Sequence, residues 1–107
     1  MSEFDVLYET ILSRKENAEE GSYTRYLFDK GLEKILKKVG EESCEVVIAA
    51  MKHDNEECKN EICDVIYHLF VMMAELGITL DDVNEELKKR SLKLNNFKGE
   101  RKKIENI

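Results

Sequence analysis

The chain has 107 residues, enough for one domain and too few for two independent hydrophobic cores. Its formal net charge of −6 argues against a nucleic-acid-binding surface, which would need a basic face. With no Pro, no Trp, 37% charged residues and 42% hydrophobic residues, the composition is that of an all-α protein with few sharp turns.

The N-terminal third is predicted to form two helices. Ser2 can cap the first, whose apolar residues recur at helical spacing and which should end near Gly21. A short helix follows, with Ser22 or Thr24 as its N-cap and Gly31 as the residue that ends or bends it.

Two longer helices are predicted for the middle of the chain. From Leu32 to about His53 the apolar residues form a stripe with a period of 3.6, which is typical of an amphipathic helix. The next helix, from about Glu56 to Leu76, is apolar on nearly all sides in its second half and should be the most buried element. Because the connection between them is short, the two helices are expected to pack antiparallel.

A last helix is predicted after Thr79, which forms an approximate capping box with Asp82, and it should run to about Leu92. Residues 1–95 are interpreted as a single domain and residues 96–107 as a charged C-terminal tail with little periodicity. A helix that is apolar on all sides needs more cover than so short a chain supplies. We therefore expect a bundle of four to five helices completed by homodimerisation.

The cysteines and the N-terminus bear on the compartment. Cys44, Cys58 and Cys63 are odd in number and form no CxxC pair, so we interpret them as small core residues in a reducing cytosol. The N-terminus lacks a basic region followed by a long apolar run, and no stretch approaches ~18 uninterrupted apolar residues. The sequence thus predicts a cytoplasmic protein without a signal peptide or membrane span.

Two pairs of acidic residues stand at helix-neighbour spacing on the two middle helices. The first pair is Glu42 and Glu45, beside Glu41, and the second is Glu61 and Asp64. If the helices pack antiparallel, the two pairs can face each other. Crowded carboxylates cost stability unless a cation lies between them, and Mg²⁺, or Mn²⁺ in its place, prefers oxygen ligands. The alternative is a solvated acidic helix face, the usual explanation of a single ExxE pattern.

Three further residues have two interpretations each. Lys38 stands one helical turn before Glu42, where it can contact a bound phosphate or belong to a solvated basic face. Arg90 has the same two interpretations. His68 can be a ligand or general base, but a single His in a buried helix is more often a hydrogen-bonded core residue.

The pattern ExxE, fifteen residues, then ExxD resembles the MazG-type all-α nucleotide pyrophosphohydrolase superfamily. More narrowly, the chain is similar to the phosphoribosyl-ATP pyrophosphohydrolase family over roughly residues 4 to 92. The segments that carry this similarity are "SYTRYLFDKGLEKILKKVGEESCEVVIAA", "NEICDVIYHLFVMM" and "ELKKR". Cys44, Ile62 and Cys63 depart from the family's usual residues, and none of them is an expected ligand.

The resemblance implies Mg²⁺-dependent hydrolysis of 1-(5-phosphoribosyl)-ATP to 1-(5-phosphoribosyl)-AMP and pyrophosphate by a homodimer, the second step of histidine biosynthesis. The expected metal ligands are Glu42, Glu45, Glu61 and Asp64. The expected catalytic carboxylates, which orient or deprotonate the attacking water, are Glu41, Glu42 and Glu45. The expected substrate contacts are Ser22, Thr24, Lys38 and Arg90.

Two alternative functions use parts of the same pattern. A house-cleaning pyrophosphohydrolase acting on canonical or damaged dNTPs would share the metal cluster but not the ribosyl-phosphate pocket, and substrate profiling distinguishes it. A non-catalytic helical dimerisation or regulatory module would bind a basic partner through the acidic cluster, and it would release no pyrophosphate.

Overall fold

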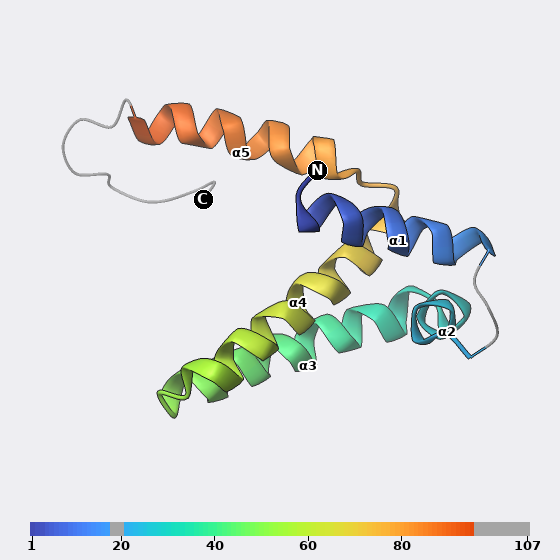
Figure 1. The fold of residues 1–107 in the computed structure, drawn as a ribbon, viewed down its shortest axis with the longest axis horizontal. Coiled ribbons are helices and arrows are strands. Elements are labelled where there is room, and N and C mark those ends of the chain that lie inside the picture. The colour runs from blue at the N-terminus through green and yellow to red at the C-terminus, as the bar shows by residue number, and fades with distance from the viewer. Residues whose placement is uncertain (18–20, 96–107) are drawn as a thin grey trace. The chain divides into compact units, whose positions relative to one another are not determined.

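The computed structural model describes residues 1–17 and 21–95, and these residues form α-helices joined by short connections (Figure 1). In chain order the helices are α1 (Glu3–Asn17), α2 (Tyr23–Lys30), α3 (Leu32–Met51), α4 (Asn55–Leu76) and α5 (Leu80–Asn95). The all-α prediction is confirmed. Helix α1 ends at Asn17, before the predicted end near Gly21, and α5 continues three residues beyond Leu92. The predicted tail over 96–107 lies outside the described residues.

The N-terminal helix ends are set by local hydrogen bonds. The Ser2 backbone nitrogen donates to Asp5 Oδ2 at 3.0 Å, and the Asp5 nitrogen donates to Ser2 Oγ at 3.3 Å. These reciprocal bonds satisfy donors that the first turn of α1 leaves unpaired. Ser22 caps α2 by accepting from the Arg25 nitrogen at 3.3 Å, so of the two predicted caps Ser22, and not Thr24, has this role.

The ends of α4 and the start of α5 are also set by local interactions. Asp54 caps α4 by accepting from the Glu57 nitrogen at 3.0 Å. Gly77 ends α4 with a φ of 81°, a left-handed conformation that costs other residues roughly 1–2 kcal/mol. Thr79 and Asp82 exchange two hydrogen bonds of 3.0 Å each, which confirms the capping box.

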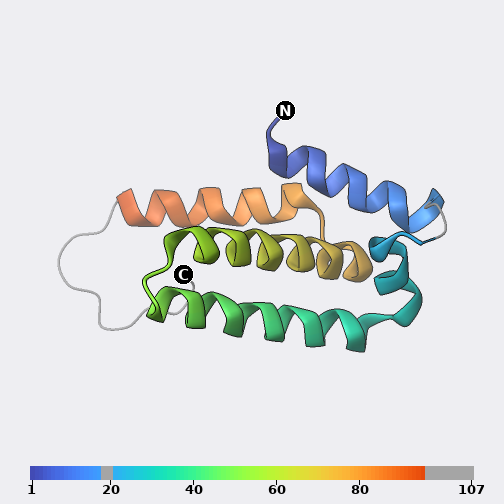
Figure 2. The ribbon, with the colours of Figure 1, turned by 60° about the horizontal axis from the view of Figure 1, so that its bottom comes forward.

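By its internal contacts the chain divides into two compact units, Met1–Gly77 and Ile78–Ile107. The first unit contains α1 to α4, and the second contains α5. Within the first unit α3 and α4 run antiparallel, side by side along most of their length (Figure 2). The expected packing across the short connection is confirmed, while the single domain over residues 1–95 stays a prediction.

The core of the first unit is built by all four of its helices. The largest fully buried side chains, one from each helix, are Ile11, Leu27, Ile35 and Val71. In α4 the buried residues are His68, Val71, Met73 and Ala74, more than in any other helix, so its predicted central place is confirmed. Among the described residues no single helix is long and apolar enough to cross a membrane. Only α4 and α5 taken together reach the length and composition of a membrane span.

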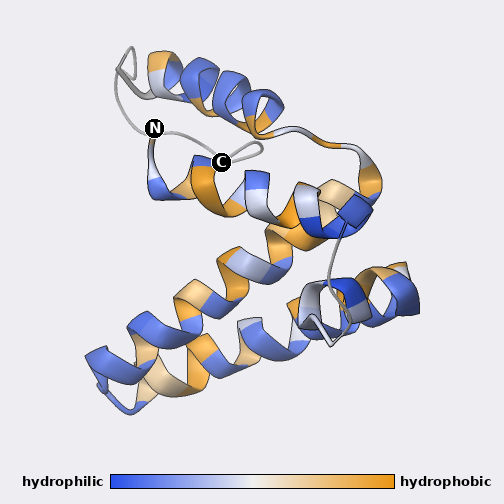
Figure 3. Cartoon of the chain, turned by 45° about the vertical axis from the view of Figure 1, so that its right-hand side comes forward, coloured by the Kyte–Doolittle hydropathy of each residue, from blue (hydrophilic) through white to orange (hydrophobic). Residues whose placement is uncertain are grey.

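Within the described part of the chain, hydrophobic residues of α3 and α4 are exposed. Hydrophobic segments recur along both helices (Figure 3), and Val47 and Met51 are 62% and 77% exposed. Cys44, one turn before Val47, is exposed, as is Cys63, while Cys58 is half-buried. The prediction of core cysteines is therefore wrong for Cys44 and Cys63, because the contact between α3 and α4 buries only the helix faces turned toward each other.

Candidate metal centre

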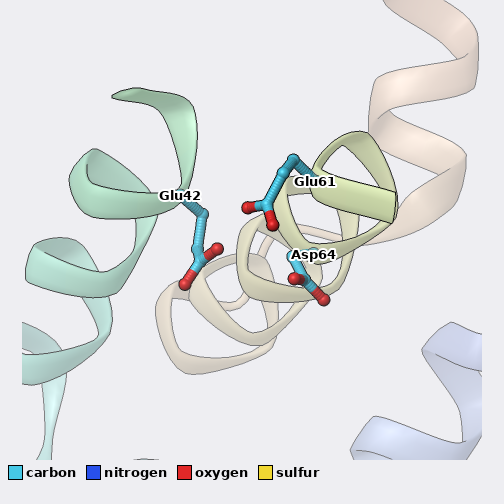
Figure 4. Close-up of side chains that lie close together, drawn as sticks. All are labelled: Glu42, Glu61 and Asp64. Carbon is cyan, nitrogen blue, oxygen red and sulfur yellow. The ribbon is translucent and has the colours of Figure 1, made fainter. Parts of the chain in front are cut away.

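Carboxylates from α3 and α4 converge in the first unit, as the antiparallel packing predicted. Glu42 of α3 points toward Glu61 and Asp64 of α4 (Figure 4), and each of the three offers an oxygen within 4.8 Å of the others. Two ligands on opposite sides of one Mg²⁺ ion are about 4.2 Å apart, since each bond is about 2.1 Å long. The spacing of these oxygens is therefore close to that of ligands that share one ion.

Glu61 has the most demanding environment of the three. Its Oε2 atom is buried and has no hydrogen-bond partner among the described residues, a situation that is costly for an ionised carboxylate. Burial, followed by the charges of Glu45 and Glu42, raises the pKa of Glu61 above its ordinary range. A side-chain interaction with Glu42 also raises this pKa, since a hydrogen bond between the two groups requires one of them to be protonated. The site therefore favours either a proton or a bound cation, and the unpartnered oxygen fits a hard divalent ion.

The two remaining acidic candidates lie beside this cluster. Glu45 is exposed and stands outside the group of converging oxygens. Its charge nevertheless raises the pKa of Glu61, and this effect is larger than the effect of the Glu42 charge. Glu41 is exposed and forms an ion pair with Lys38 at 3.5 Å. The structure thus brings together three of the four predicted ligands and leaves Glu45 within electrostatic reach.

Lys38 lies at the edge of the cluster, where the helical spacing predicted it. Its Nζ atom is 3.4 Å from Glu42 Oε1, and its half-buried side chain also pairs with Glu41. Burial alone would lower the pKa of Lys38, but its interactions with Tyr23, Glu42 and Glu41 outweigh burial and raise it. The ammonium group therefore stays charged at neutral pH, as a phosphate contact requires.

Of the other predicted substrate contacts, the two hydroxyl residues have structural partners. The Ser22 hydroxyl caps α2 and also accepts from Arg14 Nη1 at 3.5 Å. Thr24 is buried, and its hydroxyl is hydrogen-bonded to the Tyr67 hydroxyl. Arg90 lies in the second unit, where its Nε atom pairs with Glu86 at 3.2 Å. Substrate contact by these three residues stays a prediction.

The sequence analysis gave Tyr23 no role in the site. Its hydroxyl is 3.0 Å from Nε2 of His68, which is buried, so the interpretation of His68 as a hydrogen-bonded core residue is confirmed. Burial raises the pKa of Tyr23, and the charge of Lys38 opposes that rise. Helical periodicity does not signal the contact between Tyr23 and His68, because these residues are 45 positions apart and lie on different helices.

Known proteins resemble the chain over most of its length. A family model described as phosphoribosyl-ATP pyrophosphohydrolase matches residues 4–91, which include every carboxylate discussed above. A phosphoribosyl-ATP pyrophosphatase of Clostridium novyi (strain NT) is 55% identical over 101 residues, covering 94% of this chain and 92% of that protein. The protein of the same name from Bacillus cereus (strain AH187) is 50% identical over 104 residues, covering 97% and 96%.

Proposed function

Because this chain belongs to the phosphoribosyl-ATP pyrophosphohydrolase family, we propose that the converging carboxylates of α3 and α4 hold Mg²⁺ for the hydrolysis of 1-(5-phosphoribosyl)-ATP. The reaction yields 1-(5-phosphoribosyl)-AMP and pyrophosphate, and it is the second step of histidine biosynthesis. The observation that supports the metal most directly is the buried, unpartnered Oε2 of Glu61 beside Glu42 and Asp64.

Each side chain near the cluster has a distinct part in this proposal. Glu42, Glu61 and Asp64 hold the ion, and Glu45 joins them by a rotation of its exposed side chain. When bound, Mg²⁺, or Mn²⁺ in its place, neutralises charge on the triphosphate and makes a bound water more acidic. Lys38 adds a fixed positive charge for a phosphate oxygen. Glu41 or Glu45 orients the attacking water or accepts its proton.

An assay that compares several nucleotide substrates and identifies the products distinguishes this function from the house-cleaning alternative. With Mg²⁺ present, we expect phosphoribosyl-ATP to be cleaved at least about tenfold faster than any common dNTP, because only the former has a second ribosyl phosphate for the site to recognise. The measurement is pyrophosphate release, with monophosphate release followed in parallel. Faster turnover of a dNTP, or monophosphate as the product, would contradict the assignment.

We also propose that the enzyme is a cytoplasmic homodimer whose interface includes the exposed hydrophobic face of α3. This face contains Val47 at 62% and Met51 at 77% exposure, and two copies of it would shield each other from water. The three free thiols are usual for a reducing cytoplasm.

Light scattering tests the dimer. We expect a mass of twice the 12.5 kDa of one chain for the wild type, and dissociation for Val47→Glu, since the substitution would bury a charge in the interface. Ser13→Glu introduces the same charge at an exposed position of α1, so it should stay dimeric and is the control. A monodisperse wild-type monomer at micromolar concentration would contradict the proposal.

A further inference from the structure

Three tyrosine rings from α2 and α4 form a row. Tyr23 stacks on both Tyr26 and Tyr67, with ring centroids 6.1 Å apart in each pair and interplanar angles of 23° and 26°. Nearly parallel rings at this separation are offset, so each leaves part of its face uncovered. Tyr23 and Tyr26 are 45% and 41% exposed, whereas Tyr67 is half-buried. The part of the row that belongs to α2 therefore presents aromatic surface to solvent.

Hydrogen bonds place this row of rings beside the carboxylate cluster. The Tyr23 hydroxyl is 3.0 Å from Nε2 of His68, and Nδ1 of the same ring is 2.7 Å from the backbone oxygen of Asp64. Tyr67 follows Asp64 by three residues on α4, so their side chains lie on the same side of that helix. Four residues of an α-helix rise by about 6 Å. The rings therefore begin roughly one helical turn from Asp64.

Contacts beneath the exposed rings hold them in place. His68 is buried and packs edge-on against Tyr23 and Tyr67, with ring centroids 5.9 Å and 4.9 Å apart. The Tyr67 hydroxyl is hydrogen-bonded to buried Thr24. A surface that is already fixed loses little conformational freedom when a ligand binds to it. The row is thus a preorganised surface for a flat ligand ring.

A positive charge lies next to the exposed rings. The Lys30 ammonium is 5.8 Å from the centroid of the Tyr26 ring, and Lys30 forms no ion pair among the described residues. Aromatic rings beside a cation are the usual means by which proteins bind nucleobases that are attached to phosphates. The ligand class that matches the surface is therefore a nucleotide.

We propose that the exposed rings of Tyr23 and Tyr26 form a nucleobase subsite, on which the purine of phosphoribosyl-ATP stacks while its triphosphate reaches the carboxylate cluster of α3 and α4. This inference rests on the proposed function, which supplies the purine nucleotide. Stacking of a base on an aromatic side chain changes affinity by about five- to a hundredfold. The two tyrosines thus add affinity for the base to whatever affinity the phosphate contacts provide.

Paired substitutions separate the effect of the rings from that of the hydroxyl groups. Tyr23→Leu and Tyr26→Leu remove a ring, whereas Tyr23→Phe and Tyr26→Phe keep the ring and remove only the hydroxyl. Phe4→Leu is the control for the loss of an exposed ring elsewhere, since Phe4 is 54% exposed on α1 and packs edge-on against Phe70.

Binding is measured in the presence of Mg²⁺ with ATP and with inorganic triphosphate, which lacks the base. We expect the wild type to bind ATP at least about fivefold more tightly than triphosphate. Both Leu variants of the tyrosines should weaken ATP binding by about five- to a hundredfold and leave triphosphate binding within about twofold. The Phe variants and Phe4→Leu should stay within about threefold of the wild type for both ligands. Unchanged ATP binding by Tyr26→Leu, or an equal loss for both ligands, would overturn the inference.

A second measurement uses the absence of Trp from the chain. In Tyr26→Trp the only indole replaces one of the two proposed rings, so ATP should quench its fluorescence and inorganic triphosphate should not. Phe4→Trp should respond to neither ligand. No quenching at position 26, or equal quenching at both positions, would refute stacking at this surface.

The two proposals fail in different ways. If the wild type does not hydrolyse phosphoribosyl-ATP while the binding results hold, the proposed function is wrong and the two rings still bind a purine nucleotide. If the wild type is active and Tyr26→Leu binds ATP as the wild type does, only the nucleobase subsite is wrong.

Discussion

Glu61→Gln is expected to lower the hydrolysis of phosphoribosyl-ATP by at least about a hundredfold while leaving the metal-free protein as stable as the wild type or more stable. The metal's charge stabilisation is worth several kcal/mol, and each ~1.4 kcal/mol is a factor of ten in rate. The neutral amide keeps the shape of the side chain, removes the unpartnered charge and has an N–H group that can donate to Glu42. Stability and activity should therefore separate at this position.

Glu57→Gln is the control for this prediction. Glu57 is on the same helix and exposed, it lies outside the converging carboxylates, and its substitution should change the rate by less than about twofold. The comparison needs kcat/KM with Mg²⁺ and melting temperatures without metal. Full activity of Glu61→Gln, or a metal-free melting temperature well below that of Glu57→Gln, would show that Glu61 is a structural residue.

Removing divalent metal with EDTA is expected to lower pyrophosphate release by about a thousandfold or more, with recovery on addition of Mg²⁺. The metal should also stabilise the fold, because it binds the assembled cluster better than the unfolded chain. At a hundred times its dissociation constant it would add about 2.7 kcal/mol, which corresponds to a rise of roughly 10–20 °C in melting temperature for a domain of this size. The absence of any such shift in the wild type would argue against a metal site.

The raised pKa of Glu61 gives this metal effect a pH dependence. An acid whose pKa is higher in the folded state stabilises the fold below its unfolded pKa, and that contribution is lost as the pH rises through the folded value. Metal-free stability from this group should therefore decline with rising pH, and Mg²⁺ should raise the melting temperature more at pH 8 than at pH 5. Glu61→Gln should show a smaller metal shift and a weaker pH dependence. Equal shifts at both pH values would contradict this account.

Much of the fold could be predicted because its signals are local. The caps at Ser2, Asp54 and Thr79 each bond to a residue three positions away, so the sequence spells out both partners. The left-handed turn at Gly77 needs glycine for its own backbone alone. The sequence also predicted that Glu42 would lie opposite Glu61 and Asp64. The short connection makes α3 and α4 antiparallel, and the period of 3.6 residues places the acidic residues of each helix on one face of it.

The tertiary structure alone decided how deeply each of these side chains is buried and which distant residue it meets. Periodicity assigned Glu45 and Glu61 to similar positions, but the rotation of each packed helix about its axis left Glu45 exposed and Glu61 with a buried, unpartnered oxygen. The exposure of Cys44 depends in the same way on which face the neighbouring helix covers. The bond between Tyr23 and His68 spans 45 residues and exists because α2 docks against α4. No local pattern encodes such a contact, since it follows from the packing of side chains on several helices at once.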